Sequence, residues 1–148
     1  MQYLALMKKT DQLAQLSTYQ AMNPQSLFKI IDQTNKGISY PAFHQLVSKM
    51  PFTLTQWAHF LRISKRTLER IREEKKVISP TSSEHILRIV MLYNYGVSVF
   101  GNKKNFDLWL TLESIPLGYI RPLDLLNNSY VIEAIRGELG RIEHGILS

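Results

Sequence analysis

Apolar residues recur at spacings of three and four along most of this 148-residue chain, and alternating runs of β-branched residues are nearly absent. Spacings of three and four bring side chains to one face of an α-helix, whereas alternation brings them to one face of a strand. A chain of this length buries roughly two-thirds of the surface that its unfolded form exposes, enough for a core without disulfides or structural zinc. The sequence therefore predicts an all-α fold, with an N-terminal helix-turn-helix bundle followed by a small helical C-terminal region.

Helix start signals divide this periodicity into segments. Thr53 and Gln56 have the spacing of a capping box, in which each residue hydrogen-bonds the backbone of the other. Ser79 before Pro80 is a second start signal, and Glu84 is placed for another capping box. We expect helices to begin at Pro24, after Ser39, at Leu54, at Lys65, at Pro80, near Phe106 and after Asn128 or Ser129.

The last of these helices carries apolar residues at steps of four, four and three, namely Val131, Ile135, Leu139 and Ile142. Gly137 and Gly140 lie inside it. Each glycine costs a helix about 1 kcal/mol relative to Ala. We therefore expect both to mark close packing against another backbone.

The composition excludes several classes of function. The chain has no Cys, which excludes thiol chemistry and Cys-based zinc or iron sites, and its four His lack the spacing that puts two ligands on one helical face. No nucleophile stands with a base, no carboxylates pair in a pocket-forming context, and the glycines are spread singly. We expect neither enzyme activity nor a metal or cofactor.

The N-terminal residues lack the pattern of a signal peptide. The most apolar stretch, residues 86–100, is interrupted by Arg88 and Asn94 and is shorter than the roughly 20 residues of a membrane span. We expect a cytoplasmic protein with no membrane partner. Residues 1–22 have only a weak helical pattern and are interpreted as a mobile N-terminal arm.

Charge is distributed unevenly along the chain. Residues 1–106 carry 15 basic and 6 acidic side chains, whereas residues 107–148 carry 3 basic and 6 acidic ones. A basic segment suits a polyanion through phosphate neutralisation and counterion release, while a mildly acidic end suits protein or solvent. The two ends are therefore expected to face different partners.

Residues 53–76 have the layout of a helix-turn-helix, with a capped short helix, a turn of about three residues and a second helix that starts after Ser64. In that geometry the N-terminal part of the second helix enters the major groove, where Lys and Arg reach guanine and Thr contacts a base edge or a thymine methyl. Leu68 and Ile71 are expected to turn inward onto Trp57 and Phe60. The candidates for base contact are Lys65, Arg66, Thr67 and Arg70.

Phosphate contacts are expected from the flanking basic residues, because such contacts fix register without reading sequence. The segment from Lys49 to Lys76 holds eight basic and three acidic residues. The phosphate-binding candidates are Arg62, Arg72, Lys75 and Lys76. The alternative is a pair of amphipathic helices whose Lys and Arg are only solvated.

The segment from Ile63 to Arg70 resembles the recognition helix of the antitoxins of RES-Xre toxin-antitoxin systems, the Xre/MbcA/ParS family. The resemblance covers about residues 27–146, with short matches in the family's order. These matches are Val99-Phe100-Gly101, Trp109-Leu110, Leu117-Gly118, Pro122 to Leu126 and Leu139 to Gly145. The chain departs from the family at three places. Tyr119 stands where family members often have a second Gly, Arg121 stands where they often have a small or polar residue before the Pro, and they often have a Gly near the position of Tyr130. The backbone of residues 113–130 is therefore expected to differ locally.

The resemblance implies an antitoxin with two working parts: a DNA-binding domain over residues 23–101 and a toxin-binding domain over 102–148. The first would bind the operator double-stranded DNA of its own operon, as a homodimer if the operator has the usual two-fold symmetry. The second would neutralise a cognate RES-domain toxin, an NAD-degrading enzyme, by covering its active site. The toxin-binding candidates carried over in this way are Arg141, Glu143, His144, Gly145 and Ile146.

The alternative is a stand-alone helix-turn-helix repressor that dimerises through its C-terminal helices and has no toxin partner. Both interpretations predict operator binding. They differ in the tail, because only an antitoxin needs it to neutralise the product of a neighbouring gene.

Overall fold

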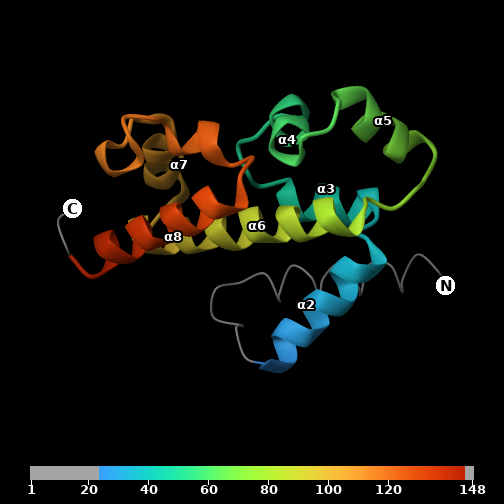
Figure 1. Cartoon of the computed structure of the whole chain (residues 1–148), viewed down its shortest axis with the longest axis horizontal. Coiled ribbons are helices and arrows are strands. Elements are labelled where there is room, and N and C mark those ends of the chain that lie inside the picture. The colour runs from blue at the N-terminus through green and yellow to red at the C-terminus, as the bar shows by residue number, and fades with distance from the viewer. Residues whose placement is uncertain (1–23, 146–148) are drawn as a thin grey trace. The chain divides into compact units, whose positions relative to one another are not determined.

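The structure of the protein is a computed structural model, and the residues described are 24–145. Helices account for most of these residues, and the only strand-type pairings among them are two isolated bridges, Ser39 with Val77 and Ser114 with Ile120 (Figure 1). The helices are α2 (Pro24–Lys36), α3 (Tyr40–Val47), α4 (Leu54–Leu61), α5 (Lys65–Glu73), α6 (Pro80–Phe100), α7 (Lys103–Thr111) and α8 (Ser129–Glu143), with 3₁₀ turns η2 (Ile115–Leu117) and η3 (Pro122–Leu125). The predicted all-α fold is confirmed.

The chain divides into two compact units between Met91 and Leu92, inside α6. One long helix therefore contributes its first half to the first unit and its second half to the second. The predicted functional boundary after Gly101 stays a prediction, and the proposed arm of residues 1–22 lies outside the described residues.

An aromatic cluster forms the core of the first unit. Trp57 of α4 lies at its centre, edge to face with Phe43 of α3 and Phe60 of its own helix, both with ring centroids 5.5 Å away. Phe52, just before α4, packs edge to face on Trp57 and Phe60. Such pairs contribute about 0.5–1.5 kcal/mol beyond the burial of their area, so this cluster fixes α4 against α3.

The buried hydroxyl of Ser83 joins three separate parts of the first unit. Its Oγ accepts a hydrogen bond from the backbone N–H of Ile38 at 2.9 Å and donates one to the carbonyl of Ile78 at 3.2 Å. The N–H of Ile78 in turn donates to the carbonyl of Ile38 at 2.8 Å. Gly37 makes this approach possible, because its φ is +83° and an added Cβ would lie 2.4 Å from the Ile78 carbonyl oxygen. The segment before α3 is thus tied to the segment after α5 and to the first turn of α6.

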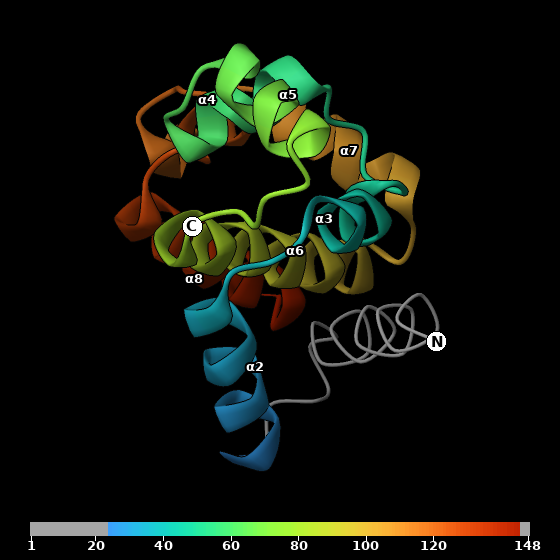
Figure 2. The same ribbon diagram turned by 90° about the vertical axis from the view of Figure 1, so that its right-hand side faces the viewer.

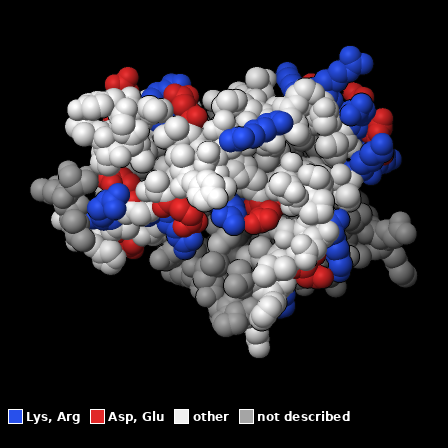
Figure 3. Space-filling model, viewed as in Figure 1, with Lys and Arg blue, Asp and Glu red and all other residues white. Residues whose placement is uncertain are grey.

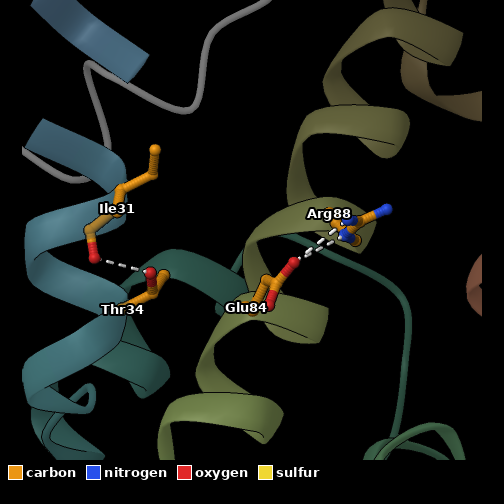
Figure 4. Close-up of polar contacts among 4 residues, drawn as sticks. All are labelled: Ile31, Thr34, Glu84 and Arg88. Carbon is orange, nitrogen blue, oxygen red and sulfur yellow. Dashed lines mark hydrogen bonds and ion pairs between the residues drawn. The ribbon is translucent and has the colours of Figure 1, made fainter. Parts of the chain in front are cut away.

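The predicted start of α6 at Ser79 and Pro80 is confirmed, whereas the predicted capping box at Glu84 is wrong. Ser79 is the N-cap, since its Oγ accepts from the backbone N–H of Ser82 at 3.2 Å. Glu84 does not form the predicted capping box and instead accepts hydrogen bonds from Arg88 one turn later (Figure 4). Because Pro80 occupies the first helical position, the cap falls at Ser79, and Glu84 lies too far along the helix to reach back to it.

The second unit is built from the end of α6 together with α7, α8 and the two 3₁₀ turns. Phe106 of α7 is buried against Gly96 of α6, where an added Cβ would lie 2.1–2.5 Å from ring atoms. The Phe106 ring also stacks on Trp109, with centroids 5.8 Å apart. α7 begins three residues before the predicted Phe106, because the side chain of Asn102 caps it by accepting from the N–H of Asn105.

The expectation for the two glycines of α8 is wrong. An added Cβ on Gly137 would meet only the Arg141 guanidinium, at 3.9 Å, and one on Gly140 would meet the hydroxyl of Tyr95, at 3.7 Å. Neither glycine meets another backbone. Among the glycines inside helices, Gly96 is the one that close packing requires, because the Phe106 ring occupies the place of its side chain.

We expect Ser83→Ala to lower the free energy of unfolding by about 1–3 kcal/mol, because it leaves the buried N–H of Ile38 without an acceptor. Urea unfolding followed by circular dichroism measures the change. The matched control is Ser82→Ala, in the same turn, which should change stability by no more than about 0.5 kcal/mol. Equal effects of the two substitutions would contradict the role given to the Ser83 hydroxyl.

We expect Gly96→Ala to destabilise the second unit by about 1–3 kcal/mol, since the new methyl group meets the buried Phe106 ring. Gly137→Ala is the control, because the same change in open space should stabilise α8 by up to about 1 kcal/mol. Phe106→Leu combined with Gly96→Ala should recover part of the loss. Thermal unfolding checks all three, and a neutral Gly96→Ala would show that the ring moves aside freely.

Candidate nucleic-acid and partner-binding sites

The predicted helix-turn-helix is formed by α4 and α5, which pack against each other and are joined by a short turn (Figure 2). The predicted capping box opens α4: Thr53 Oγ1 accepts from the Gln56 N–H at 3.1 Å, and Gln56 Oε1 accepts from the Thr53 N–H at 2.8 Å. Ser64 caps α5 by accepting from the N–H of Thr67 at 3.0 Å. These local signals set where both helices begin.

Arg62 makes the turn between the two helices. Its φ of 56° lies in the left-handed region, which costs a residue with a Cβ but not a glycine. The turn is closed by two backbone bonds at 3.1 Å, from Arg62 N–H to the His59 carbonyl and from Ile63 N–H to the Ala58 carbonyl. The exposed Arg62 side chain is therefore carried at a backbone position that glycine would occupy with less strain.

α5 is held to the unit by one side and presents basic residues on the other. Leu68 is fully buried and Ile71 half-buried, as predicted. Arg66 and Arg70 are exposed one helical turn apart, and the described residues offer Arg66 no hydrogen bond or ion pair. Lys65 is exposed as well and lies 3.9 Å from Glu69, a weak contact that a phosphate or a base could replace.

The hydroxyl of Thr67, another predicted base-contact residue, already has a partner within the chain. Its Oγ1 lies 2.7 Å from Ser64 Oγ, and its residue is half-buried. The Thr67 hydroxyl is therefore already engaged by the residue that caps α5.

The four predicted phosphate contacts differ in their surroundings. The guanidinium of Arg72 lies 5.9 Å from the centre of the Tyr40 ring of α3, a distance at which cation and ring attract. Lys75 is exposed and has a left-handed backbone, with φ 54°. Lys76 Nζ lies 2.7 Å from a carboxylate oxygen of Glu74.

Acidic residues lower the positive charge at the end of α5. The hydrogen bond from Lys76, together with the charges of Lys76 and Arg70, lowers the pKa of Glu74, so that this carboxylate stays ionised. Figure 3 shows Lys and Arg side chains gathered over α5, at the upper right of that view, with acidic side chains among them. The start of α5 is the part with exposed Arg and the fewest competing carboxylates.

The predicted partner-binding residues begin in the last turn of α8 and continue past its end. Asn128 caps this helix by accepting from the N–H groups of Tyr130 and Val131, at 2.9 and 3.3 Å. Of the predicted stripe, Ile135 and Leu139 are buried, Val131 is half-buried and Ile142 is exposed, while Ile132 is an additional buried residue.

Two of the predicted toxin-binding side chains make contacts within the second unit. Arg141 pairs with Glu138 at 2.7 Å, and Glu138 is only 5% exposed. Glu143 Oε2 accepts a hydrogen bond of 2.5 Å from the hydroxyl of buried Tyr95, on α6. The Tyr95 hydrogen bond joins the end of α8 to α6, whereas the pair of Arg141 and Glu138 lies within α8. His144 and Gly145 are exposed beyond them, and Ile146 lies outside the described residues.

Sequence reasoning missed Glu138 and Tyr95. The spacing of three between Glu138 and Arg141 is a recognisable helical ion-pair signal. Nothing in the sequence marks Tyr95, because its partner lies 48 residues away and meets it only when α8 folds back. Within residues 24–145, no three His, Asp or Glu side chains come together as a metal site would need, and no helix is long and apolar enough to cross a bilayer.

Comparisons with known proteins match both parts of the chain. Residues 29–91 match the model of the antitoxin Xre-like helix-turn-helix domain, and residues 96–145 match that of the antitoxin Xre/MbcA/ParS C-terminal toxin-binding domain. The chain is also 31% identical over 87 residues to a protein of Yersinia enterocolitica named "Antitoxin Xre". That match spans 58% of this chain and 59% of the relative's length. The first match contains α4 and α5, and the second contains α7 and α8, in the order found here, so the chain belongs to the family of Xre-type antitoxins.

Proposed function

We propose that this chain is the antitoxin of a type II toxin-antitoxin system that acts in the cytoplasm. It neutralises a RES-domain, NAD-degrading toxin by covering the toxin's active site, and it binds operator DNA as a homodimer to regulate its own operon. The observation that carries the proposal is the pairing of an exposed basic α5, in one compact unit, with a second unit that matches a toxin-binding domain. Its role is binding and not catalysis.

DNA binding is supported by the start of α5. Ser64 caps the helix, Leu68 anchors it, and Arg66 and Arg70 extend into solvent from successive turns. The positive end of the helix dipole and the exposed guanidinium groups both favour an approach to phosphate and to the guanine edge. Lys65 and Thr67 complete the proposed base-contact set. Arg62, Arg72, Lys75 and Lys76 are the proposed phosphate contacts.

Toxin neutralisation is supported by the way α8 ends. Glu143, the last residue of α8, accepts a hydrogen bond from Tyr95 of α6, which fixes the end of the helix within its unit. His144, Gly145 and the residues that follow are then the part that reaches the toxin's active-site entrance. A tail whose base is fixed loses less entropy on binding than one that is free along its whole length.

We expect Arg66→Ala and Arg70→Ala each to weaken operator binding by about 1–3 kcal/mol and to relax its sequence preference, if these residues read bases. Fluorescence anisotropy against the chain's own promoter, at several salt concentrations, measures both effects. Arg88→Ala is the control, because Arg88 is an exposed arginine of the same unit that is paired with Glu84 on α6.

In the same assay, Arg62→Gly distinguishes the effect of the Arg62 backbone conformation from the effect of its side chain. Glycine suits the left-handed turn, so stability should stay equal or rise, whereas loss of a phosphate contact should reduce the salt slope by about 1. If all these variants bind DNA like the unaltered chain, the DNA site lies elsewhere.

We expect removal of residues 144–148 to abolish or greatly weaken neutralisation of the adjacent gene's product, while operator affinity and thermal stability remain. This truncation keeps the Tyr95 to Glu143 and Arg141 to Glu138 contacts. Growth and cellular NAD content on co-expression are the measurements. An adjacent product that is harmless and forms no complex would favour the stand-alone repressor, and full neutralisation without the tail would place the inhibitory surface elsewhere.

A further inference from the structure

The turn between α7 and η3 exposes an unusual amount of apolar surface. Residues 114–120 form seven successive positions without a charge. Within them Ile115 is 70% exposed, Tyr119 67% and Ile120 44%. Small domains seldom leave several large apolar side chains together in water unless another molecule covers them.

Hydrogen bonds within the turn hold it closed. The N–H of Ser114 donates to the carbonyl of Ile120 at 3.1 Å, and the N–H of Tyr119 donates to the carbonyl of Ser114 at 2.9 Å. The N–H of Gly118 donates to the carbonyl of Ile115 at 3.1 Å. The exposed side chains are thus presented on a fixed backbone, which lowers the entropy lost on binding.

Tyr119 occupies a backbone conformation that suits glycine. Its φ is +63°, next to Gly118 at +76°. Among the described residues its side chain has no hydrogen bond or ring contact, so it does little to stabilise its own fold. A strained position that keeps a large exposed aromatic side chain is a sign that the side chain serves another purpose.

The turn lies against α8, the helix that leads into the proposed tail. η2 packs against α8, and Figure 1 shows it beside the half of α8 that leads toward the C-terminal end. Arg121 and Asp124 form an ion pair of 2.8 Å at the border of the turn. An apolar centre with a polar border is the usual composition of a protein-protein interface, and tyrosine is enriched among the residues that dominate binding.

We propose that residues 114–120 are a second docking site for the toxin, in which Ile115 and Tyr119 enter an apolar recess on its surface. This inference rests on the proposed function and adds a contact outside the tail. The absence of positive charge in the turn argues against DNA as its partner.

The area available argues against a second copy of this chain. Three large side chains bury on the order of 500 Å². A stable two-fold dimer needs roughly 800 Å² from each partner, more than the turn alone supplies. The turn and the neighbouring α8 together can bury that much area against a partner that the tail also contacts.

The test measures binding of the full chain to the purified product of the adjacent open reading frame by calorimetry. Tyr119→Gly removes the side chain and relieves the strained backbone, so thermal stability should stay equal or rise while Kd for the toxin increases about tenfold or more. Ile115→Ser should also weaken toxin binding, and it leaves the strained backbone of Tyr119 unchanged. Tyr130→Ala is the matched control, because Tyr130 is an exposed tyrosine outside the turn, and it should leave Kd unchanged.

The outcomes separate this inference from the proposed function. If the unaltered chain binds the toxin and both turn variants bind equally well, the docking site is refuted while the antitoxin role stands. If the unaltered chain does not bind, both fall. Sedimentation of the chain alone decides the remaining case: a dimer lost in Tyr119→Gly, with toxin affinity unchanged, would assign the turn to self-association and overturn the proposal.

Discussion

The hydroxyl of Ser83 is the contact on which the first unit depends, because it joins the backbone of Ile38, 45 residues earlier in the chain, to the segment that follows α5. Ile38 lies just before α3, Ile78 lies just after α5, and Ser83 stands in the first turn of α6. The two helices that form the helix-turn-helix lie between the first two of these points. Because both ends of the segment from Ile38 to Ile78 are fixed, α5 is held at a defined place within its unit, as a helix that reads DNA requires.

Three residues other than glycine have a left-handed backbone, among residues 24–145: Arg62, Lys75 and Tyr119. Each is exposed, and each follows the end of a helix or turn. Glycine would relieve the strain at all three positions but would remove a cation or an aromatic ring. The two cations flank α5, and the ring lies in the unit that matches a toxin-binding domain. The proposed contacts with DNA and toxin thus coincide with places where the fold gives up some local stability.

In the second unit, polar contacts join α6 to both α7 and α8. Tyr95 binds Glu143, Glu138 binds Arg141, and Tyr93 donates to Asp107 at 2.6 Å. Burial and the hydrogen bond to Asp107 raise the pKa of Tyr93, so this phenol remains a donor at neutral pH. The residues that sequence similarity nominates for toxin binding therefore include two, Arg141 and Glu143, whose side chains are engaged within the second unit.

The sequence by itself determined where most helices begin, because caps such as Thr53, Ser64 and Asn128 act within three or four residues of themselves. It also determined which side of α5 is buried, since Leu68 follows from helical periodicity. Only the tertiary structure decided that Ser83 hydrogen-bonds to two separate loops and that Glu143 hydrogen-bonds to Tyr95. It also decided that packing requires Gly96 rather than Gly137. Those contacts join residues far apart in the chain, and no local spacing or propensity specifies such a meeting.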